Sequence, residues 1–225
     1  AIEVNEQKKK KRIELEHVLK NRERELATLV DPVREKILSE RHTDPEISEP
    51  VDLRPVAAWE FDGNLKSSVG AFPLKKHGKV EFKDGMVLLG PNSYLQSAHL
   101  PFELKAKSLE VWFLLKNLDQ RGGGLMGIQG PGDFFDTIVL GERMPRHWIS
   151  GSNGFSRTND FGGSKPEDFV NKMIHLIMTY ETNGMIKLYR NGELYGKPYK
   201  KPLATFPMGK SSVLFGLRHL PKGGN

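Results

Sequence analysis

Two Asn-Gly dipeptides between strand-like runs constrain the fold of this chain more than any other feature. Asn183-Gly184 and Asn191-Gly192 separate alternating apolar segments in the stretch 173–195. Asn-Gly favours a type I′ turn, because both central residues of that turn need positive φ. Two such turns in succession predict three antiparallel strands in a meander. No long helical pattern interrupts them, so a parallel α/β sheet is not expected.

Most of the chain after Pro55 shows the period-two alternation of strands, with Gly, Asn and Asp between short apolar runs. The predicted strands are Ala57–Phe61, Lys79–Phe82, Met86–Leu89, Ser108–Leu115, Leu125–Ile128, Phe135–Leu140, Trp148–Ser150, Lys172–Tyr180, Met185–Arg190 and Val213–Leu217. About ten strands in roughly 170 residues predict a mainly β fold, a two-sheet antiparallel jelly-roll sandwich.

Residues 1–41 predict an α-helical segment in front of this sandwich. Apolar residues recur at spacings of three, four and seven, as on one face of a helix. They are Leu15, Leu19, Leu26, Leu29, Val33 and Ile37. Asp31-Pro32 fits an N-cap followed by a first helical position, which predicts a kink or a two-helix hairpin, with a break slightly favoured. Such a helix must bury its apolar stripe on the rest of the chain, on a second copy or on another domain.

The composition divides the chain into three parts. Residues 42–55 contain three prolines and no periodicity, which is typical of a linker. We therefore expect a helical arm at 1–41, a linker at 42–55 and a sandwich at 56–225.

Charge and composition exclude several classes of function. The chain has a net charge of +6, but basic and acidic residues are mixed along it. The one dense basic run, Lys8–Arg12, lacks the interleaved aromatic side chains of a nucleic-acid-binding site. No run of apolar residues is long enough to span a membrane. The chain has no Cys, which excludes disulfides, thiol catalysis and thiolate metal sites.

The apparent catalytic motifs in the sequence lack the structural context that their chemistry needs. Gly122–Gly127 matches G-x-G-x-x-G, but Ile128–Gly132 after it contains Pro and Gly and cannot start the helix that a dinucleotide site needs. A glycosidase on such a sandwich needs two carboxylates on one face, and the strand around Glu110 has one. His175 alternates with apolar neighbours and is expected to be structural. We therefore do not expect an enzyme.

The stretch Arg143–Gly163 is the richest in groups that suit a sugar, because it combines aromatic, amide, hydroxyl and guanidinium side chains. The candidate ligand-binding residues are Trp148, Ser152, Asn153, Arg157, Asn159 and Asp160. Alternatively, Trp148 belongs to the core and Glu142 pairs with Arg157. Of the six, Asn153, Asn159 and Asp160 are expected at the surface.

Several of these segments carry a family resemblance. Ala58–Gly63, Ser108–Phe113, His175–Tyr180, Asn183–Gly196 and Val213–Leu217 resemble the strands of the laminin G-like, concanavalin A-like lectin/glucanase jelly roll. The resemblance implies a non-catalytic module that binds carbohydrate or protein. Two alternatives remain: a structural module whose helical arm docks a partner domain, and a glycoside hydrolase, which the absence of paired carboxylates disfavours.

A narrower resemblance involves Phe135–Glu142, Trp148–Ser152 and Phe155–Thr158. These segments resemble the lectin-like domain of large secreted planctomycete proteins that also contain a c-type cytochrome domain. This implies a larger exported bacterial protein in the periplasm or outside the cell. The partners would be glycans or other protein domains and chains of the same complex.

The resemblance also implies a possible calcium ion at the sandwich rim, for which Asp62 and Asp136 are the candidate ligands. No other cofactor is expected. Domains of this kind usually return at their end with a strand that pairs near the first one, whereas Leu220–Asn225 has a loop composition. We therefore expect a fragment whose last strand lies further along the chain or is supplied by a separate chain.

Overall fold

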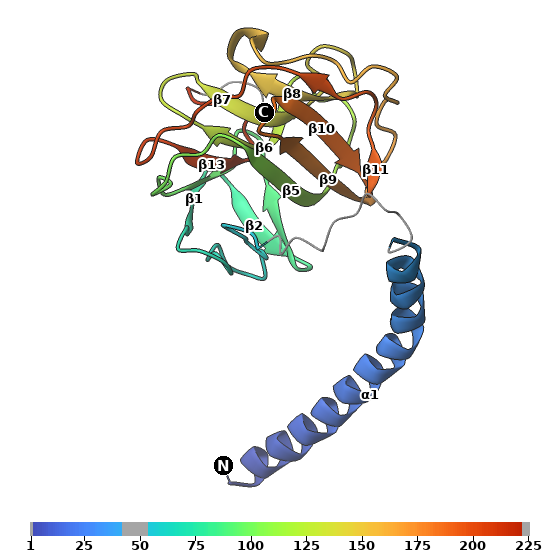
Figure 1. Cartoon of the computed structure of the whole chain (residues 1–225). Helices are drawn as coiled ribbons and strands as arrows, with labels where there is room; N and C mark the ends of the chain where they lie inside the picture. The colour runs from blue at the N-terminus through green and yellow to red at the C-terminus, as the bar shows by residue number, and fades with distance from the viewer. Residues whose placement is uncertain (1, 42–53, 222–225) are drawn as a thin grey trace. The chain divides into compact units, whose positions relative to one another are not determined.

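The computed structural model describes residues 2–41 and 54–221 and divides the chain into two units. The first unit contains a single α-helix, α1 (Ile2–Arg41). It continues through Pro32, so the predicted break and the two-helix hairpin are wrong, and Figure 1 shows one curved helix. Proline in a helix removes the N–H donor of one hydrogen bond and its ring crowds the carbonyl of the preceding turn, and a helix accommodates both by bending.

The second unit is the predicted antiparallel sandwich, with two sheets that face each other (Figure 1). The larger sheet has the order β1-β4-β13-β6-β7-β8. These strands are β1 (Leu74–His77), β4 (Tyr94–Ser97), β6 (Gly123–Gln129), β7 (Phe135–Leu140), β8 (Trp148–Ser152) and β13 (Ser212–Phe215).

The smaller sheet has the order β11-β10-β9-β5, and β12 also pairs with β10. Its strands are β5 (Lys107–Leu114), β9 (Met173–Tyr180), β10 (Met185–Arg190), β11 (Glu193–Leu194) and β12 (Tyr199–Lys200). A separate hairpin consists of β2 (Val80–Lys83) and β3 (Met86–Leu89), and a short 3₁₀ helix, η1 (Asn153–Phe155), follows β8.

The predicted meander is present as β9, β10 and β11, but only one of its two turns has the predicted geometry. Asn191 and Gly192 both have positive φ, at 51° and 85°, as a type I′ turn requires. At the other turn only Gly184 is left-handed, at 82°. There the Glu181 N–H bonds to the Met185 carbonyl, which makes a three-residue loop that ends in a left-handed glycine.

The predicted first strand, Ala57–Phe61, does not form a strand. Ala58 makes one isolated bridge to Val69, and Phe61 has a positive φ of 61°. Instead, the Trp59 and Phe61 rings pack edge-on against Phe215, at centroid distances of 5.4 and 5.5 Å. Both rings are partly buried against the core.

The interior between the sheets is apolar and continuous. Fully buried residues come from both sheets and include Leu95, Ile138, Ile174, Leu176, Met178 and Leu188. This inward set defines which side chains of each strand point outward, and it therefore decides which residues a ligand can reach.

Candidate functional site

Three of the six predicted ligand-binding residues are buried, namely Trp148, Ser152 and Arg157. The Trp148 side chain is 1% exposed, packs edge-on against Phe113 at 5.3 Å and donates its indole N–H to Glu167 at 3.0 Å. Ser152 is also buried and shares a hydrogen bond with Thr158 at 3.0 Å. The core interpretation of Trp148 therefore holds in the structure, and neither side chain reaches the surface from its present position.

Arg157 belongs to an ionic network inside the sandwich. Its Nε donates to Asp136 Oδ1 at 3.0 Å, and Lys107 Nζ donates to Asp136 Oδ2 at 2.7 Å. The side chains of Lys107 and Asp136 are 2% and 1% exposed. Burial lowers the pKa of Lys107, and the Asp136 carboxylate partly offsets that effect. The predicted Glu142–Arg157 pair is wrong, because Glu142 pairs with Arg218 instead.

The residues present do not fit the expected calcium site. Both carboxylate oxygens of Asp136 already accept hydrogen bonds from cationic side chains, so this carboxylate has no open face for a metal ion. Asp62 lies in an exposed bend of the chain. Among the described residues, no group of three or more His, Asp or Glu side chains is placed to hold a metal ion.

The remaining predicted residues lie in the segment that follows β8, in which Asp160 forms an isolated antiparallel bridge with Ile149 of β8. Asn153 and Asn159 are half-buried, and Asn153 Oδ1 accepts a hydrogen bond from Arg157 at 3.1 Å. Asp160 pairs with Arg143 at 3.0 Å, and the Arg143 guanidinium lies 5.8 Å from the centre of the Phe155 ring. Arg143, Asn153, Phe155 and Asp160 form what we call the β8 edge cluster. Phe155 is 44% exposed there.

The most exposed aromatic side chain lies elsewhere, on the outer face of the smaller sheet. Trp112 on β5 is 64% exposed. Its indole stacks on the His175 ring of β9, with centroids 4.1 Å apart and planes 11° apart. His175 Nε2 lies 2.8 Å from Glu110 Oε1 and fixes the orientation of the imidazole. We call Glu110, Trp112 and His175 the Trp112 platform.

Strand alternation places these three residues together. Leu109 and Phe113 point into the core, so Glu110 and Trp112 must point outward. Trp112 lies directly opposite His175 in the β5–β9 register, which brings the two rings into contact. This platform could have been predicted from the sequence, because the alternation in Ser108–Leu115 puts Trp112 on the opposite face of the strand from the apolar residues that point inward. We instead expected His175 to be structural and placed the ligand near Trp148.

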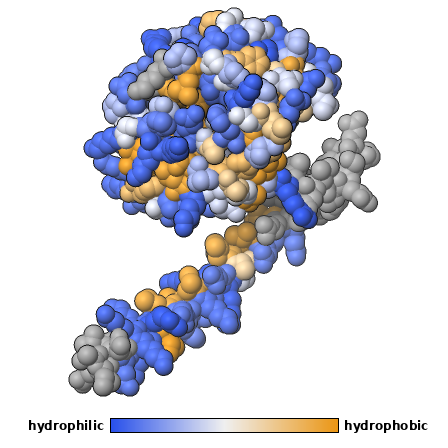
Figure 2. Space-filling view, turned by 90° about the vertical axis from the view of Figure 1, so that its left-hand side faces the viewer, coloured by the Kyte–Doolittle hydropathy of each residue, from blue (hydrophilic) through white to orange (hydrophobic). Residues whose placement is uncertain are grey.

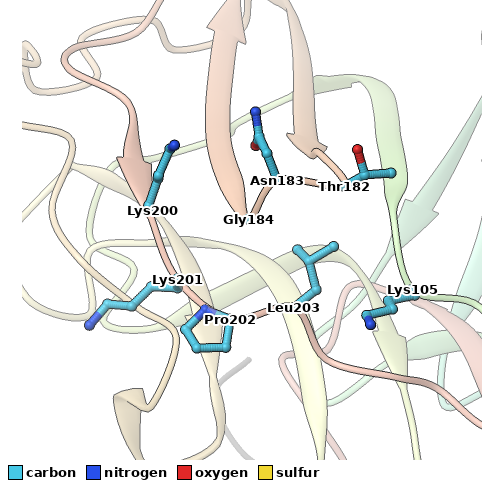
Figure 3. Close-up of a pocket in the computed structure, with 8 residues that line it drawn as sticks. All are labelled: Lys105, Thr182, Asn183, Gly184, Lys200, Lys201, Pro202 and Leu203. Carbon is cyan, nitrogen blue, oxygen red and sulfur yellow. The ribbon is translucent and has the colours of Figure 1, made fainter.

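A depression of about 530 Å³ lies at one end of the smaller sheet (Figure 3). It is lined by Lys105, Thr182, Asn183, Gly184, Lys200, Lys201, Pro202 and Leu203. Leu203 points into the middle of the view, and the amines of Lys105, Lys200 and Lys201 lie at separate places around it (Figure 3). These amines do not converge on a common point, and the depression is therefore less well organised than the Trp112 platform.

No helix in the described part of the chain is both long enough and apolar enough to cross a membrane.

A family model described as the concanavalin A-like lectin/glucanases superfamily matches residues 89–217. Among solved structures, domain 4 of an extracellular GH43 arabinanase from Geobacillus stearothermophilus, solved with arabinotriose, is 20% identical with a TM-score of 0.59. That match covers 76% of this chain and 86% of the other. The binding domain of botulinum neurotoxin serotype D is 14% identical with a TM-score of 0.52, over 72% of this chain and 42% of the toxin domain. No curated protein matches the sequence.

Proposed function

The chain belongs to the concanavalin A-like lectin/glucanases superfamily, and from that premise we propose that it is a non-catalytic module that binds carbohydrate through the Trp112 platform. One observation carries the proposal: a tryptophan that is 64% exposed is held flat on a histidine ring. We further propose that the module is part of a larger exported bacterial protein, and that its ligand is a glycan close to that protein.

The platform has the chemistry that sugar binding needs. An indole face stacks on the apolar face of a sugar ring, and nearby polar groups bind the hydroxyl groups. Covering on the order of 100 Å² of apolar surface would contribute roughly 2–3 kcal/mol. The Glu110 carboxylate is 59% exposed and uses Oε1 toward His175, so its other oxygen is available to accept a hydroxyl hydrogen bond.

The side chains also support binding rather than hydrolysis. Hydrolysis of a glycosidic bond usually needs two carboxyl groups that flank the bond. Glu110 pairs with His175 and faces Ile177 across the strands, so the platform supplies one carboxyl group. The arabinanase domain that resembles this fold was solved with arabinotriose, which supports a saccharide as the first ligand to test.

The test is a binding measurement on a glycan array that includes arabino-oligosaccharides, followed by calorimetry on any positive glycan. We expect Trp112→Ala to abolish binding and Trp112→Phe to retain part of it, because phenylalanine keeps a stacking face. Phe155→Ala in the β8 edge cluster is the matched control and should bind like the parent chain. Binding that survives Trp112→Ala but is lost in Phe155→Ala would move the site to the β8 edge cluster and contradict the proposal.

A second candidate function is assembly, in which α1 docks a partner protein domain. The observation that favours it is the exposure of apolar side chains along the helix (Figure 2). Leu15, Leu19, Leu26 and Leu29 are 59–72% exposed. If assembly is the function, the glycan array stays blank, and Leu19→Glu with Leu26→Glu releases partner domains that co-purify with the parent chain.

A further inference from the structure

The excess positive charge of this chain is concentrated in one segment of the sequence. Residues 194–225 contain six Lys and Arg residues and no Asp or Glu, so their charge equals the net +6 of the whole chain. Residues 1–193 contain 28 basic and 28 acidic residues and are neutral as a whole. The segment that follows the β9–β10–β11 meander therefore creates a local field that attracts anions.

Two lysines of this segment, Lys200 and Lys201, line the depression at the end of the smaller sheet together with Lys105 (Figure 3). Lys200 belongs to β12, which pairs with β10, and the Lys201 N–H donates to the Gly184 carbonyl at 3.0 Å. The residue before Lys105 exchanges two backbone hydrogen bonds of 3.0 and 2.8 Å with the segment after β12. Backbone hydrogen bonds thus fix all three lysines at the rim of the depression.

The charges of these three lysines are not neutralised by the groups around them. No Asp or Glu lines the depression. Glu181, in the neighbouring turn, already pairs with Lys187 at 2.6 Å. Among the described residues, no carboxylate lies within ion-pair distance of the amines of Lys105, Lys200 or Lys201. The depression is therefore a surface on which positive charge is left for a ligand.

The uncharged side chains of the depression also suit a ligand that is rich in acceptor oxygens. Asn183 Oδ1 accepts the Met185 N–H at 2.8 Å, so the Asn183 amide nitrogen remains to donate. Thr182 adds an exposed hydroxyl group. Ammonium and amide N–H groups donate to carboxylate, sulfate and hydroxyl oxygens, and hydrogen bonds to an ionised acceptor are the stronger ones.

The spacing of the amines favours a polymer over a small anion. The amines lie at separate places around the depression, so one small anion cannot contact all three (Figure 3). A chain that carries anionic groups at intervals can place one group near each amine. The lining contains no aromatic side chain on which the bases of a single-stranded nucleic acid could stack.

We propose that this depression binds a linear acidic polysaccharide. Its repeated carboxylate or sulfate groups pair with the three amines, and its hydroxyl groups bond to Asn183 and Thr182. The choice of a saccharide among polyanions rests on the proposed carbohydrate-binding function. The site is separate from the Trp112 platform, because Lys105 precedes β5 and Trp112 lies near the other end of that strand.

The test is calorimetry on the whole chain with polygalacturonate, and its methyl ester is the neutral control on the same backbone. We expect the acid form to bind and the ester not to bind. Affinity should fall about tenfold between about 50 and 200 mM NaCl, because binding releases counterions. Dextran sulfate and dextran repeat the comparison for sulfate, and the tighter acidic polymer identifies the preferred anionic group. If neither acidic polymer binds, this proposal is wrong and the Trp112 platform is unaffected.

Paired substitutions locate the site. Lys200→Gln with Lys201→Gln removes two amines and keeps the backbone hydrogen bonds of both residues, so we expect about tenfold weaker binding. Lys75→Gln with Lys76→Gln, on exposed positions of β1, lowers the net charge equally and should bind like the parent chain. Trp112→Ala should also bind the acidic polymer like the parent. Equal losses in both lysine pairs, or loss in Trp112→Ala, would contradict the proposal.

Two further measurements keep the result unambiguous. If the double variant at the depression does not fold, Lys105→Gln replaces it, because this exposed residue comes from another segment of the chain; full affinity in Lys105→Gln would overturn the proposal. A DNA duplex at the same concentration of charge tests the other class of polyanion. If the duplex binds as tightly as the acidic polysaccharide and is weakened equally by the lysine substitutions, the surface does not select a saccharide and the proposal fails.

Discussion

The buried network of Lys107, Asp136 and Arg157 allows one prediction to be worked out from geometry. Asp136→Asn removes the single negative charge between two cations whose side chains are 2% and 11% exposed. Removing one partner of a buried ion pair costs about 3–5 kcal/mol, because the remaining charge is left without compensation. For a domain of this size that loss corresponds to a decrease in Tm of roughly 6–20 °C.

Lys107→Met is the informative comparison. Asp136 keeps Arg157 as a partner at 3.0 Å, and methionine can occupy the space of the lysine stem without a charge to desolvate. The contact of the amine with the Tyr180 ring, at 4.0 Å, is lost. We therefore expect Lys107→Met to cost less than about 2 kcal/mol. In the double variant with Asp136→Asn, the cost should be smaller than the sum of the two single costs.

Urea unfolding followed by tryptophan fluorescence measures these differences. All three tryptophans, Trp59, Trp112 and Trp148, belong to the sandwich, so the signal does not report on α1. The free energies of unfolding are compared at one pH and one salt concentration. If Lys107→Met destabilises the sandwich as much as Asp136→Asn does, uncompensated charge is not the cause of the effect, and the reasoning fails.

Three further predictions concern packing, pH and metal. Gly124→Ala should prevent folding of the sandwich, because a Cβ would lie 2.2 Å from the Arg218 nitrogen; a cooperative urea transition near the parent midpoint would contradict this. Burial raises the pKa of Tyr180 well above 10, so the folded state keeps a proton that the unfolded state loses above pH 10. Stability should therefore fall as pH rises beyond 10, by up to about 1.4 kcal/mol per pH unit for this group, and Tyr180→Phe should show a shallower fall in the same urea series. A chelator or added calcium should leave Tm unchanged, because Lys107 and Arg157 already neutralise Asp136; a calcium-dependent increase in Tm would contradict this.

Much of the fold follows from the sequence because it depends on local patterns. Period-two alternation located most of the longer strands, and Asn191-Gly192 formed the turn that its residues require. Two short strands of the larger sheet, β1 and β4, were missed because neither shows strict alternation. β4 lies between β1 and β13, and three of its four residues are buried. The narrower planctomycete resemblance and the exported context stay predictions.

The candidate site was harder to predict, because exposure depends on partners that lie far apart in the chain. Trp112 and Trp148 are both strand residues with apolar neighbours. Trp148 is buried because Phe113 and Glu167 surround it, and Trp112 is exposed because its side chain leaves the sheet on the outer face. Arg157 suits a ligand by its chemistry, but Asp136, 21 positions earlier, occupies its guanidinium.

The sequence by itself determined the local geometry of this protein: a helical arm, a series of short strands, one tight turn with two left-handed residues, and the family to which the sandwich belongs. Only the tertiary structure decided which aromatic ring meets solvent and which charges neutralise one another. The physical reason is that turn conformation and the periodicity of apolar residues depend on residues that are close together in the chain. Burial, ion pairing and strand order depend on contacts between residues that are distant in the sequence.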